Sequence, residues 1–244
     1  MEVADNVKKF RNEWKYCCTE SELSMVEART KGILKPDAHG TDNGKYTVHS
    51  LYFDDPVYSC AVATESGISN RYKYRIRYYG DSPTLLRLER KEKENGRCRK
   101  KSCLLTMKEY EHIMSGQIEE VFWNTENDVL KRFCIDIWEK GFEPKVIIDY
   151  ERIAYVEEIT NVRITLDKNI TASGNVEHFL DRDYVASPLL EKGMHVLEVK
   201  FDHILPGYMK KAIYINSLQQ TSFSKYYLGL KKMVSKNGGV NLKI

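Results

Sequence analysis

The sequence has no long apolar run, and this absence limits where the protein can reside. Its 244 residues are 42% hydrophobic, but the purely apolar stretches are only a few residues long, whereas a membrane-spanning helix needs roughly 20. Polar and charged residues follow Met1 closely, which argues against a secretion signal. We therefore expect a cytoplasmic protein without a transmembrane segment.

Cysteine, histidine, glycine and proline do not form the usual short motifs. The six cysteines include no C-x-x-C pair, which argues against a zinc knuckle or a redox dithiol. The six histidines show no H-E-x-x-H spacing, and no G-x-x-x-x-G-K loop is present. Because there are only six prolines and no Pro/Ser-rich linker, we expect a single domain over residues 1–234 and a flexible C-terminal tail over 235–244.

The net charge is small, but the charges are unevenly distributed. The 38 basic and 35 acidic residues give +3 overall. The segment 71–101 contains twelve Lys and Arg against four Asp and Glu, which is +8, so the remainder carries −5. Such a run is usually a solvated surface, and only the spacing of its charges can indicate a binding site.

Short runs of alternating polar and apolar residues fill most of the sequence, and this period of two predicts β-strands. The predicted strands cover 11–17, 46–54, 71–79, 84–93, 97–105, 144–156, 161–168 and 195–202. Capping boxes at Thr19 and Thr106 predict two helices. A third helix is expected from about Thr125 to Lys140, and a fourth after Pro206.

The polar faces of these strands are strongly cationic. Every second residue of 71–79 projects from one face of the strand, and these residues are Arg71, Lys73, Arg75 and Arg77. The alternate positions are mostly tyrosines, whose parity favours a packed outer face over a stacking platform. Other strands repeat the pattern, with Lys, Arg and a few carboxylates on one side.

A row of cations requires either water or an anion. Neighbouring positions on one strand face lie about 7 Å apart, where two like charges repel by roughly 2 kcal/mol at an effective dielectric of about 20. If the strands close into a barrel, the cationic faces meet inside it, and a polyanion held by Arg and Lys is the natural occupant. The interspersed carboxylates would then bind a divalent metal that bridges phosphate oxygens.

Eight short motifs occur in a distinctive order. They are Arg11-x-Glu13-x-Lys15-Tyr16, Ser50-Leu-Tyr52-Phe-Asp54-Asp, Lys73-Tyr-Arg75-Ile-Arg77-Tyr-Tyr, Glu89-x-Lys91, Tyr150-x-Arg152, Val162-Arg163-Ile-Thr-Leu-Asp167, Leu197-Glu198-Val-Lys200-Phe-Asp and Phe223-Ser224-Lys225-Tyr226. Together they resemble the catalytic domain of the polyphosphate polymerases of the vacuolar transporter chaperone (VTC) type, which belongs to the triphosphate tunnel superfamily. The resemblance covers about residues 8 to 232.

This resemblance implies both a fold and an activity. The implied fold is of the α+β class: a closed, mostly antiparallel β-barrel with helices packed outside. The implied activity transfers the γ-phosphoryl group of ATP onto a growing inorganic polyphosphate, with Mn²⁺ or Mg²⁺ as the cofactor. ATP and polyphosphate are thus the implied partners, and no nucleic acid polymer is expected.

The resemblance also assigns site residues by position. The implied catalytic cations are Arg75, Arg77, Lys91, Arg152 and Lys225. The implied phosphate contacts are Lys15, Lys100, Tyr150, Lys200 and Ser224, and the implied metal ligand is Glu198. For the strand after Gly96, the distance to the next helix favours Lys100, although face parity with Arg97 and Arg99 favours Lys101. Ser222 stands where some relatives have another Lys.

The roles of three further carboxylates are less defined. Glu13 and Glu89 lie on the cationic side, either as metal ligands or as ion-pair partners that position Lys15 and Lys91. We expect Asp167 to orient Arg163.

Two other functions remain open. A triphosphatase of the same superfamily would use the same bore with water as the nucleophile, but such metal-dependent enzymes tend to present several glutamates. Here Glu13, Glu89 and Glu198 are the only clear candidates in the sequence. A non-catalytic polyphosphate-binding module is the second alternative. No aromatic face accompanies the basic one, which argues against binding of single-stranded RNA.

Overall fold

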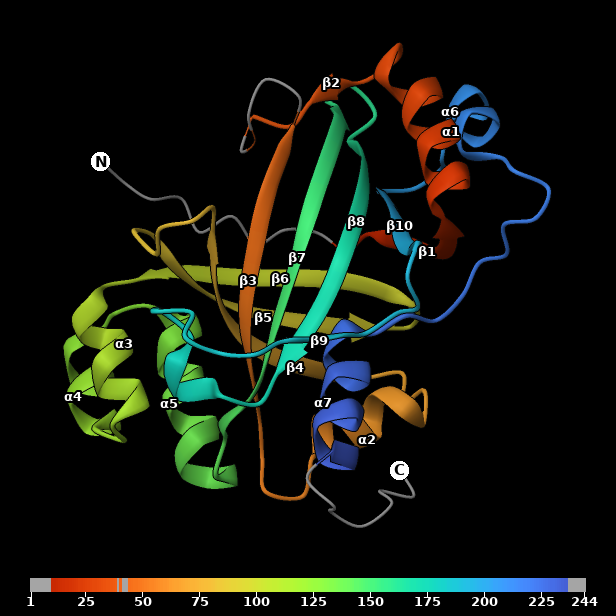
Figure 1. Cartoon of the computed structure of the whole chain (residues 1–244). Helices are drawn as coiled ribbons and strands as arrows, with labels where there is room; N and C mark the ends of the chain where they lie inside the picture. The colour runs from red at the N-terminus through yellow and green to blue at the C-terminus, as the bar shows by residue number, and fades with distance from the viewer. Residues whose placement is uncertain (1–9, 39, 41–43, 237–244) are drawn as a thin grey trace.

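The computed structural model describes residues 10–38, 40 and 44–236, and a ten-stranded antiparallel sheet forms its centre (Figure 1). The strands are β1 (Asn12–Thr19), β2 (Lys35–Pro36), β3 (Lys45–Asp54), β4 (Arg71–Tyr79), β5 (Leu86–Glu94), β6 (Arg97–Leu105), β7 (Glu143–Glu157), β8 (Val162–Ser173), β9 (Ser187–Pro188) and β10 (Met194–Phe201). Their order is β1-β10-β8-β7-β3-β4-β5-β6, with β2 and β9 attached to β7 and β8. All eight predicted strands form, and the largest difference is that β8 continues to Ser173.

The sheet curls around a central space, but it is not closed into a barrel, so the expectation of a closed barrel was wrong. Among the described residues, its edge strands, β1 and β6, meet at one bridge, between Arg11 and Cys98. There the Arg11 amide donates to the Cys98 carbonyl (2.8 Å) and the Cys98 amide donates to the Arg11 carbonyl (2.9 Å). The cause is the course of β1, which pairs with β10 over its whole length, so only its N-terminal end reaches β6. The α+β class and the antiparallel pairing are confirmed.

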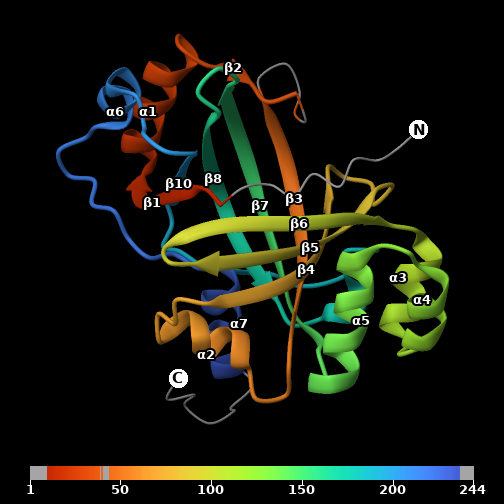
Figure 2. The same cartoon turned by 180° about the vertical axis from the view of Figure 1, so that it is seen from behind.

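Two groups of strands cross each other around this space. Figures 1 and 2 show β3, β7 and β8 running upright, with β4, β5 and β6 crossing them. Helices α1 and α6 lie at one end of the upright strands, α3 to α5 lie at the other end, and α2 and α7 lie together beneath the crossing strands.

The helices of the described segments are α1 (Glu20–Lys31), α2 (Ser59–Glu65), α3 (Met107–Met114), α4 (Ile118–Asn124), α5 (Asp128–Lys140), α6 (Gly207–Ile213) and α7 (Lys225–Lys236), with a short 3-10 helix at Val176–His178. Both predicted capping boxes are present, because Thr19 and Thr106 accept a hydrogen bond from the backbone amide three residues later and the glutamate there accepts one in return. Gly141 ends α5 at φ 68, a left-handed cap that favours glycine. No helix in the described part of the chain is long and apolar enough to cross a membrane.

Helices α2, α4 and α7 were not predicted from the sequence, and α7 bears directly on the site. Its last residues, Ser235 and Lys236, are helical where a flexible tail was predicted, and the rest of that prediction, 237–244, lies outside the described residues. At Gly229 the helix lies against the sheet: an added Cβ would come within 2.3 Å of Cδ1 of Ile148 and 3.3 Å of Cβ of Ala172. Glycine therefore allows the close approach that brings the start of α7 to the sheet.

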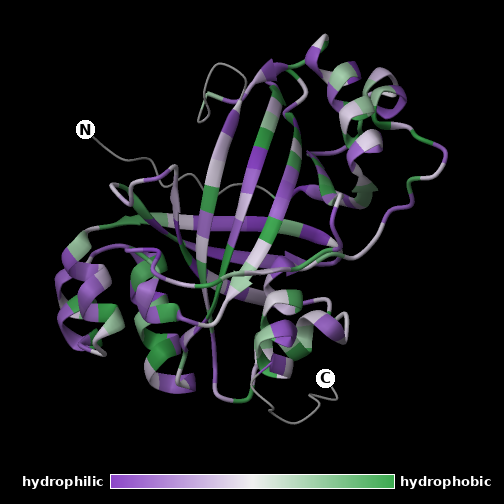
Figure 3. Ribbon diagram, viewed as in Figure 1, coloured by the Kyte–Doolittle hydropathy of each residue, from purple (hydrophilic) through white to green (hydrophobic). Residues whose placement is uncertain are grey.

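Apolar side chains pack on the outside of the sheet. One cluster lies between the sheet and α2, α3, α4, α5 and α7, and a second lies between β1, β8, β10 and the pair α1 and α6. The outward-facing tyrosines of β4 belong to the first cluster, where Tyr74 packs on Phe133 and Tyr78 on Phe179, as their parity predicted. Figure 3 shows hydrophilic and hydrophobic residues alternating along the strands. The inner face of the sheet is therefore left to polar and charged side chains.

Candidate functional site

Two connected cavities occupy the space that the sheet surrounds. The first, which we call the bore, has a volume of about 140 Å³. The second, which we call the mouth, has a volume of about 610 Å³ and lies beside α2 and α7. Glu13, Lys15, Lys73, Lys91, Cys98 and Ser224 line both cavities. The bore and the mouth therefore adjoin and share part of their wall.

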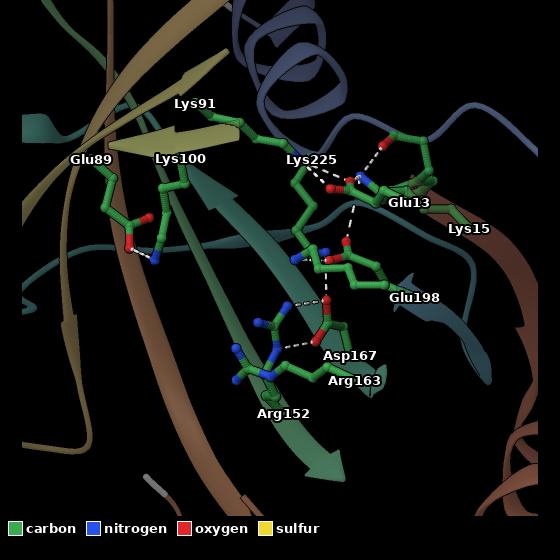
Figure 4. Close-up of polar contacts among 12 residues, drawn as sticks. Glu13, Lys15, Glu89, Lys91, Lys100, Arg152, Arg163, Asp167, Glu198 and Lys225 are labelled. Atoms are coloured by element: carbon green, nitrogen blue, oxygen red, sulfur yellow. Dashed lines mark hydrogen bonds and ion pairs between the residues drawn. The ribbon is translucent and has the colours of Figure 1, made fainter. Parts of the chain in front are cut away.

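Basic side chains dominate the wall of the bore. Among the described residues, twelve Lys and Arg line it, against two carboxylates, Glu13 and Glu198. Every site residue assigned from the sequence lies on this wall: Lys15, Arg75, Arg77, Lys91, Lys100, Tyr150, Arg152, Glu198, Lys200, Ser224 and Lys225. The side chains come from several strands and from the start of α7, and Figure 4 shows six of them, Lys15, Lys91, Lys100, Arg152, Glu198 and Lys225, with carboxylates that contact them. Lys101 does not line the bore and lies 3.9 Å from Glu92.

Glu89, in the middle of β5, binds three of these cations. Its Oε2 accepts a hydrogen bond from Nε of Arg75 at 2.8 Å and forms an ion pair with Nη2 of Arg75 at 2.6 Å. Its Oε1 accepts a hydrogen bond from Nζ of Lys100 at 2.6 Å. Nη1 of Arg77 lies 3.7 Å from Oε2. Burial alone would raise the pKa of this fully buried carboxyl, but Arg75 and Lys100 hold it well below its ordinary value. Of the two interpretations of Glu89, these contacts fit the ion-pair partner, although its partners are not Lys91.

Glu13 and Glu198 form a second cluster with lysines from β1, β5 and β10. Glu13 accepts hydrogen bonds from Lys91 at 2.7 Å and lies 3.0 Å from Nζ of Lys15. Glu198 lies 3.5 Å from Lys15 and is also paired with Lys200. Burial raises the pKa of both carboxyls, and the charge of Glu198 adds to this effect at Glu13. The surrounding lysines nevertheless hold both pKa values well below normal.

Asp167 is the anion of a third cluster, and its partners differ from the expected one. It accepts two hydrogen bonds from Arg152, at 2.6 and 2.8 Å, and one from Lys225 at 2.6 Å. Arg163 instead pairs with Asp37 at 2.6 Å, so the expectation that Asp167 orients Arg163 was wrong. The register explains the difference, because Arg152 lies directly opposite Asp167 on the neighbouring strand. Burial raises the pKa of Asp167, but Arg152 and Lys225 lower it to about 2.

The start of α7 places Ser224 and Lys225 at the junction of the cavities. The Ser224 hydroxyl accepts a hydrogen bond from the Tyr227 amide at 3.3 Å and lies 3.2 Å from Nζ of Lys73. Nζ of Lys225 lies 4.8 Å from the centre of the Tyr150 ring, and the Tyr150 hydroxyl accepts a hydrogen bond from Nη2 of Arg77 at 2.9 Å. Both hydroxyls thus lie beside cations of the bore wall, Lys73 and Arg77.

Lys73 and Tyr52 line the bore but were absent from the sequence-based assignment. The Tyr52 hydroxyl accepts a hydrogen bond from Nη1 of Arg75 at 2.8 Å. Burial raises the pKa of Tyr52, but Arg75, Arg77 and Lys73 outweigh it and lower the pKa to about 7. Burial and neighbouring cations lower the pKa of Lys73 to about 8.

Strand parity was the signal that could have identified both residues. Lys73 shares its face with Arg75. Tyr52 shares its face with Ser50, whose hydroxyl accepts a hydrogen bond from Nε of Arg77 at 3.0 Å.

Comparisons with known proteins agree with this geometry. The sequence profile of the VTC domain matches residues 10–234. No curated protein sequence matches the chain. Among solved structures, a putative adenylyl cyclase, HpAC1, from Hippeastrum, described as having a dominant triphosphatase activity, is 13% identical with a TM-score of 0.53, over 95% of this chain and 98% of its own. A putative adenylate cyclase from Bacillus halodurans is 10% identical with a TM-score of 0.47, over 94% and 90% of the two chains.

The VTC domain match and the cation-lined bore define a protein of the triphosphate tunnel class. Within that class, the match over nearly the whole sequence shows that the chain belongs to the VTC domain family.

Proposed function

We propose that this protein is a polyphosphate polymerase that transfers the γ-phosphoryl group of ATP onto the end of an inorganic polyphosphate. The observation that carries the proposal is the excess of positive charge in the bore, where the twelve cationic side chains of the described wall outnumber the seven carboxylates that line it or pair with them, which are Glu13, Glu198, Glu89, Asp167, Asp37, Glu92 and Asp202. Cations at this density repel one another unless an anion lies between them. A triphosphate and the end of a polyphosphate together supply many negative charges in a narrow, linear shape.

The chemistry requires positioning and charge neutralisation more than proton transfer. The attacking phosphate oxygen is already ionised at neutral pH, so no general base is required and none is assigned. Arg75, Arg77 and Arg152 would neutralise charge on the transferred phosphoryl group, since guanidinium groups bind phosphate oxygens in pairs. Lys91 and Lys225 carry point charges at the same place.

Other lining residues would hold the phosphates on either side of the reacting group. These residues are Lys15, Lys100, Tyr150, Lys200 and Ser224. Holding donor and acceptor in line removes much of the entropic barrier to their reaction.

The buried carboxylates have a supporting role in this proposal. Glu89 and Asp167 are fully buried and bind the cations that face the bore. They hold those cations in fixed directions before the substrate arrives, so little reorganisation is needed at the moment of transfer. A triphosphatase with a cluster of metal-binding glutamates is less compatible with these contacts, because Glu89 is committed to Arg75 and Lys100.

The implied metal, Mn²⁺ or Mg²⁺, would be held at Glu198. Mg²⁺ is commonly bound by one or two carboxylates together with substrate phosphates, and Glu198 and Glu13 are the two carboxylates on the described wall of the bore. The described residues contain no group of three or more His, Cys, Asp or Glu able to hold a metal, so the donor set fits an ion that is shared with the phosphates. For Glu198 to bind it, Lys15 or Lys200 must leave the carboxylate. When bound at Glu198, such an ion would supply further positive charge to the substrate phosphates.

A single assay tests the proposal. The purified protein is incubated with ATP and Mn²⁺, and the products are resolved on a polyacrylamide gel. We expect ladders of long polyphosphate together with ADP. Release of orthophosphate without ladders would instead identify a triphosphatase, and tight binding without turnover would identify a non-catalytic binding module; either result contradicts the proposal.

A further inference from the structure

Asp54, at the end of β3, is a fully buried carboxylate that lines neither cavity. Among the described residues no cation pairs with it, and four hydrogen-bond donors surround it instead. The amides of Asp55 and Cys60 donate to its Oδ1 at 2.9 and 3.0 Å. The amide of Ala61 donates to its Oδ2 at 3.1 Å, and the Tyr226 hydroxyl donates to the same oxygen. Such bonds are what allows an ionised carboxylate to be buried without a cation.

Two of these donors, the amides of Cys60 and Ala61, belong to the first turn of α2. Tyr58, just before that helix, has a left-handed backbone at φ 59 and makes no side-chain cap, so Asp54 does the work of a capping side chain. Because Asp54 also binds Tyr226, it joins the end of β3 to α2 and to the first turn of α7, two helices that lie together in Figures 1 and 2.

Four consecutive residues, 223–226, lead into α7, and each contacts a different strand. The first three make contacts at or just behind the bore wall, which are the Phe223 carbonyl with Nζ of Lys15 at 2.9 Å, the Ser224 hydroxyl with Nζ of Lys73 at 3.2 Å, and Nζ of Lys225 with Asp167 at 2.6 Å. The fourth, Tyr226, is fully buried and binds Asp54. Burial and the charge of Asp54 raise the pKa of Tyr226, so its hydroxyl stays protonated and donates.

The ring of Tyr226 makes contacts that do not depend on its hydroxyl. It stacks on Tyr52, with 5.2 Å between the ring centroids and 25° between the ring planes. Nζ of Lys73 lies 5.9 Å from the centroid of the Tyr226 ring. Removing the hydroxyl alone therefore separates the effect of Asp54 from that of the ring.

We propose that Asp54 is a positioning residue for the bore: through the Tyr226 hydroxyl it fixes where Ser224 and Lys225 lie relative to the substrate phosphates. The inference rests on the proposed function, because it takes Ser224 and Lys225 as phosphate contacts. Three backbone amides hold the carboxylate in place, and the hydroxyl ties α7 to it. Groups that bind a substrate are effective when contacts behind them fix their positions in advance.

The test removes only the Tyr226 hydroxyl. Tyr226→Phe keeps the ring on Tyr52, whereas substitution of Asp54 would also remove the acceptor of the α2 amides. Calorimetry without nucleotide or metal measures the affinity for tripolyphosphate, which should fall about tenfold in this variant. The variant Ser224→Ala/Lys225→Ala already lacks the two side chains that are positioned. In that background, Tyr226→Phe should change the affinity by less than about twofold, because the effects of coupled residues do not add.

The matched control is Tyr74→Phe. The Tyr74 hydroxyl also donates to a buried aspartate, Asp136, at 2.8 Å, but its ring packs on the outside of the sheet. Both variants should melt slightly below the wild-type protein, whereas only Tyr226→Phe should lose phosphate affinity. Unchanged affinity of Tyr226→Phe, or an equal loss in the control, overturns the inference.

An equal loss in the wild-type and Ser224→Ala/Lys225→Ala backgrounds would also overturn it, because Tyr226 would then act by another route. No turnover is measured, so the proposed function and this inference fail separately. Release of orthophosphate alone in the gel assay refutes the polymerase, while the positioning role of Asp54 is decided by the affinities.

Discussion

The two halves of the β4–β5 pair differ in whether their cations have a carboxylate partner. Towards the bore, Arg75 lies opposite Glu89, and the carboxylate also binds Lys100. Towards the mouth, Arg71 lies opposite Lys93, and the described residues supply neither with an ion pair. In the inner half, Glu89 thus offsets part of the charge of Arg75, Arg77 and Lys100 before any ligand binds, whereas the two outer cations have no carboxylate partner among the described residues. The inner half holds its cations in fixed positions, and the outer half leaves Arg71 and Lys93 able to pair with an anion that binds there.

The largest expected effect is on the free energy of unfolding. It comes from removing the carboxylate of the inner half, which leaves the inner cations without a partner, like those of the outer half. Glu89→Gln leaves Arg75, Arg77 and Lys100 buried together without their shared carboxylate, and removing one partner of a buried pair costs about 3–5 kcal/mol in the free energy of unfolding. Chemical denaturation measures this loss. Added tripolyphosphate should stabilise the variant more than it stabilises the wild-type protein, because the ligand supplies the missing negative charge. Unchanged stability would mean that Glu89 does not compensate the cations.

Arg75→Ala tests the catalytic role of the inner half. Removing one preorganised charge from the transferred phosphoryl group should lower the rate about a hundredfold, or about 3 kcal/mol. Melting should stay near that of the wild-type protein, because Glu89 keeps Lys100 at 2.6 Å. The rate of ADP formation from ATP measures the effect, with Lys101→Gln as the control. Full activity of Arg75→Ala would show that the site is assigned wrongly.

Tyr52→Phe tests how the ionisation of Tyr52 changes the phosphate affinity of the inner cations with pH. With a pKa of about 7, the hydroxyl of Tyr52 becomes negatively charged as the pH rises through neutrality and then competes with phosphate for Arg75. Wild-type affinity for tripolyphosphate should therefore fall by up to roughly tenfold for each pH unit above about 7. The phenylalanine variant should lack this fall. Calorimetry from about pH 6 to pH 9 compares the two proteins, so that ionisation of the phosphate itself, common to both, cancels.

Lys73 titrates in the same window, with a pKa of about 8, and therefore contributes to both curves. Its own pKa is raised by the charge of Tyr52, so Lys73→Gln in each background separates the two groups. Parallel affinity curves for wild-type protein and Tyr52→Phe in both backgrounds would exclude Tyr52 as the titrating group.

The smallest expected effect is on the melting temperature. It comes from adding a carboxylate to the outer half, which gives Arg71 a partner, as Glu89 does for the inner cations. Lys93→Glu places a carboxylate opposite Arg71, and such a cross-strand pair stabilises a sheet by a few tenths of a kcal/mol up to about 1 kcal/mol. The free protein should therefore melt slightly higher while long-chain polyphosphate binds more weakly. Melting and calorimetry on one preparation test both changes, and a lower melting temperature would contradict the compensation argument.

The strands could be predicted from the sequence because each has one charged and one apolar face. The same alternation placed Arg75 and Arg77 on the inner face together with the cations of other strands. It could not choose between Lys100 and Lys101, because face parity and distance from the next helix disagreed; the structure places Lys100 in the bore. Closure of the barrel was beyond prediction as well, because it depends on where β1 runs relative to β6.

The ion pairs could not be predicted, because they depend on strand register and on helix docking. Asp167 binds Arg152 from the neighbouring strand and Lys225 from α7, which is 58 residues further along the chain. Helix α7 itself was missed, and its position depends on contact through Gly229, whose significance is visible only once the sheet is in place.

The incomplete seam between β1 and β6 has a consequence for local stability. In the described part of the chain, a bridge of two backbone hydrogen bonds between Arg11 and Cys98 joins these two strands. The neighbouring strand pairs are joined by continuous ladders. Parting the seam breaks far fewer contacts than unfolding the domain. Local openings of this kind expose amides to solvent much more often than global unfolding exposes the amides of the core. Amide hydrogens at the seam should therefore exchange with deuterium well before those of β7 and β8, and a ligand that spans both edges should slow them most.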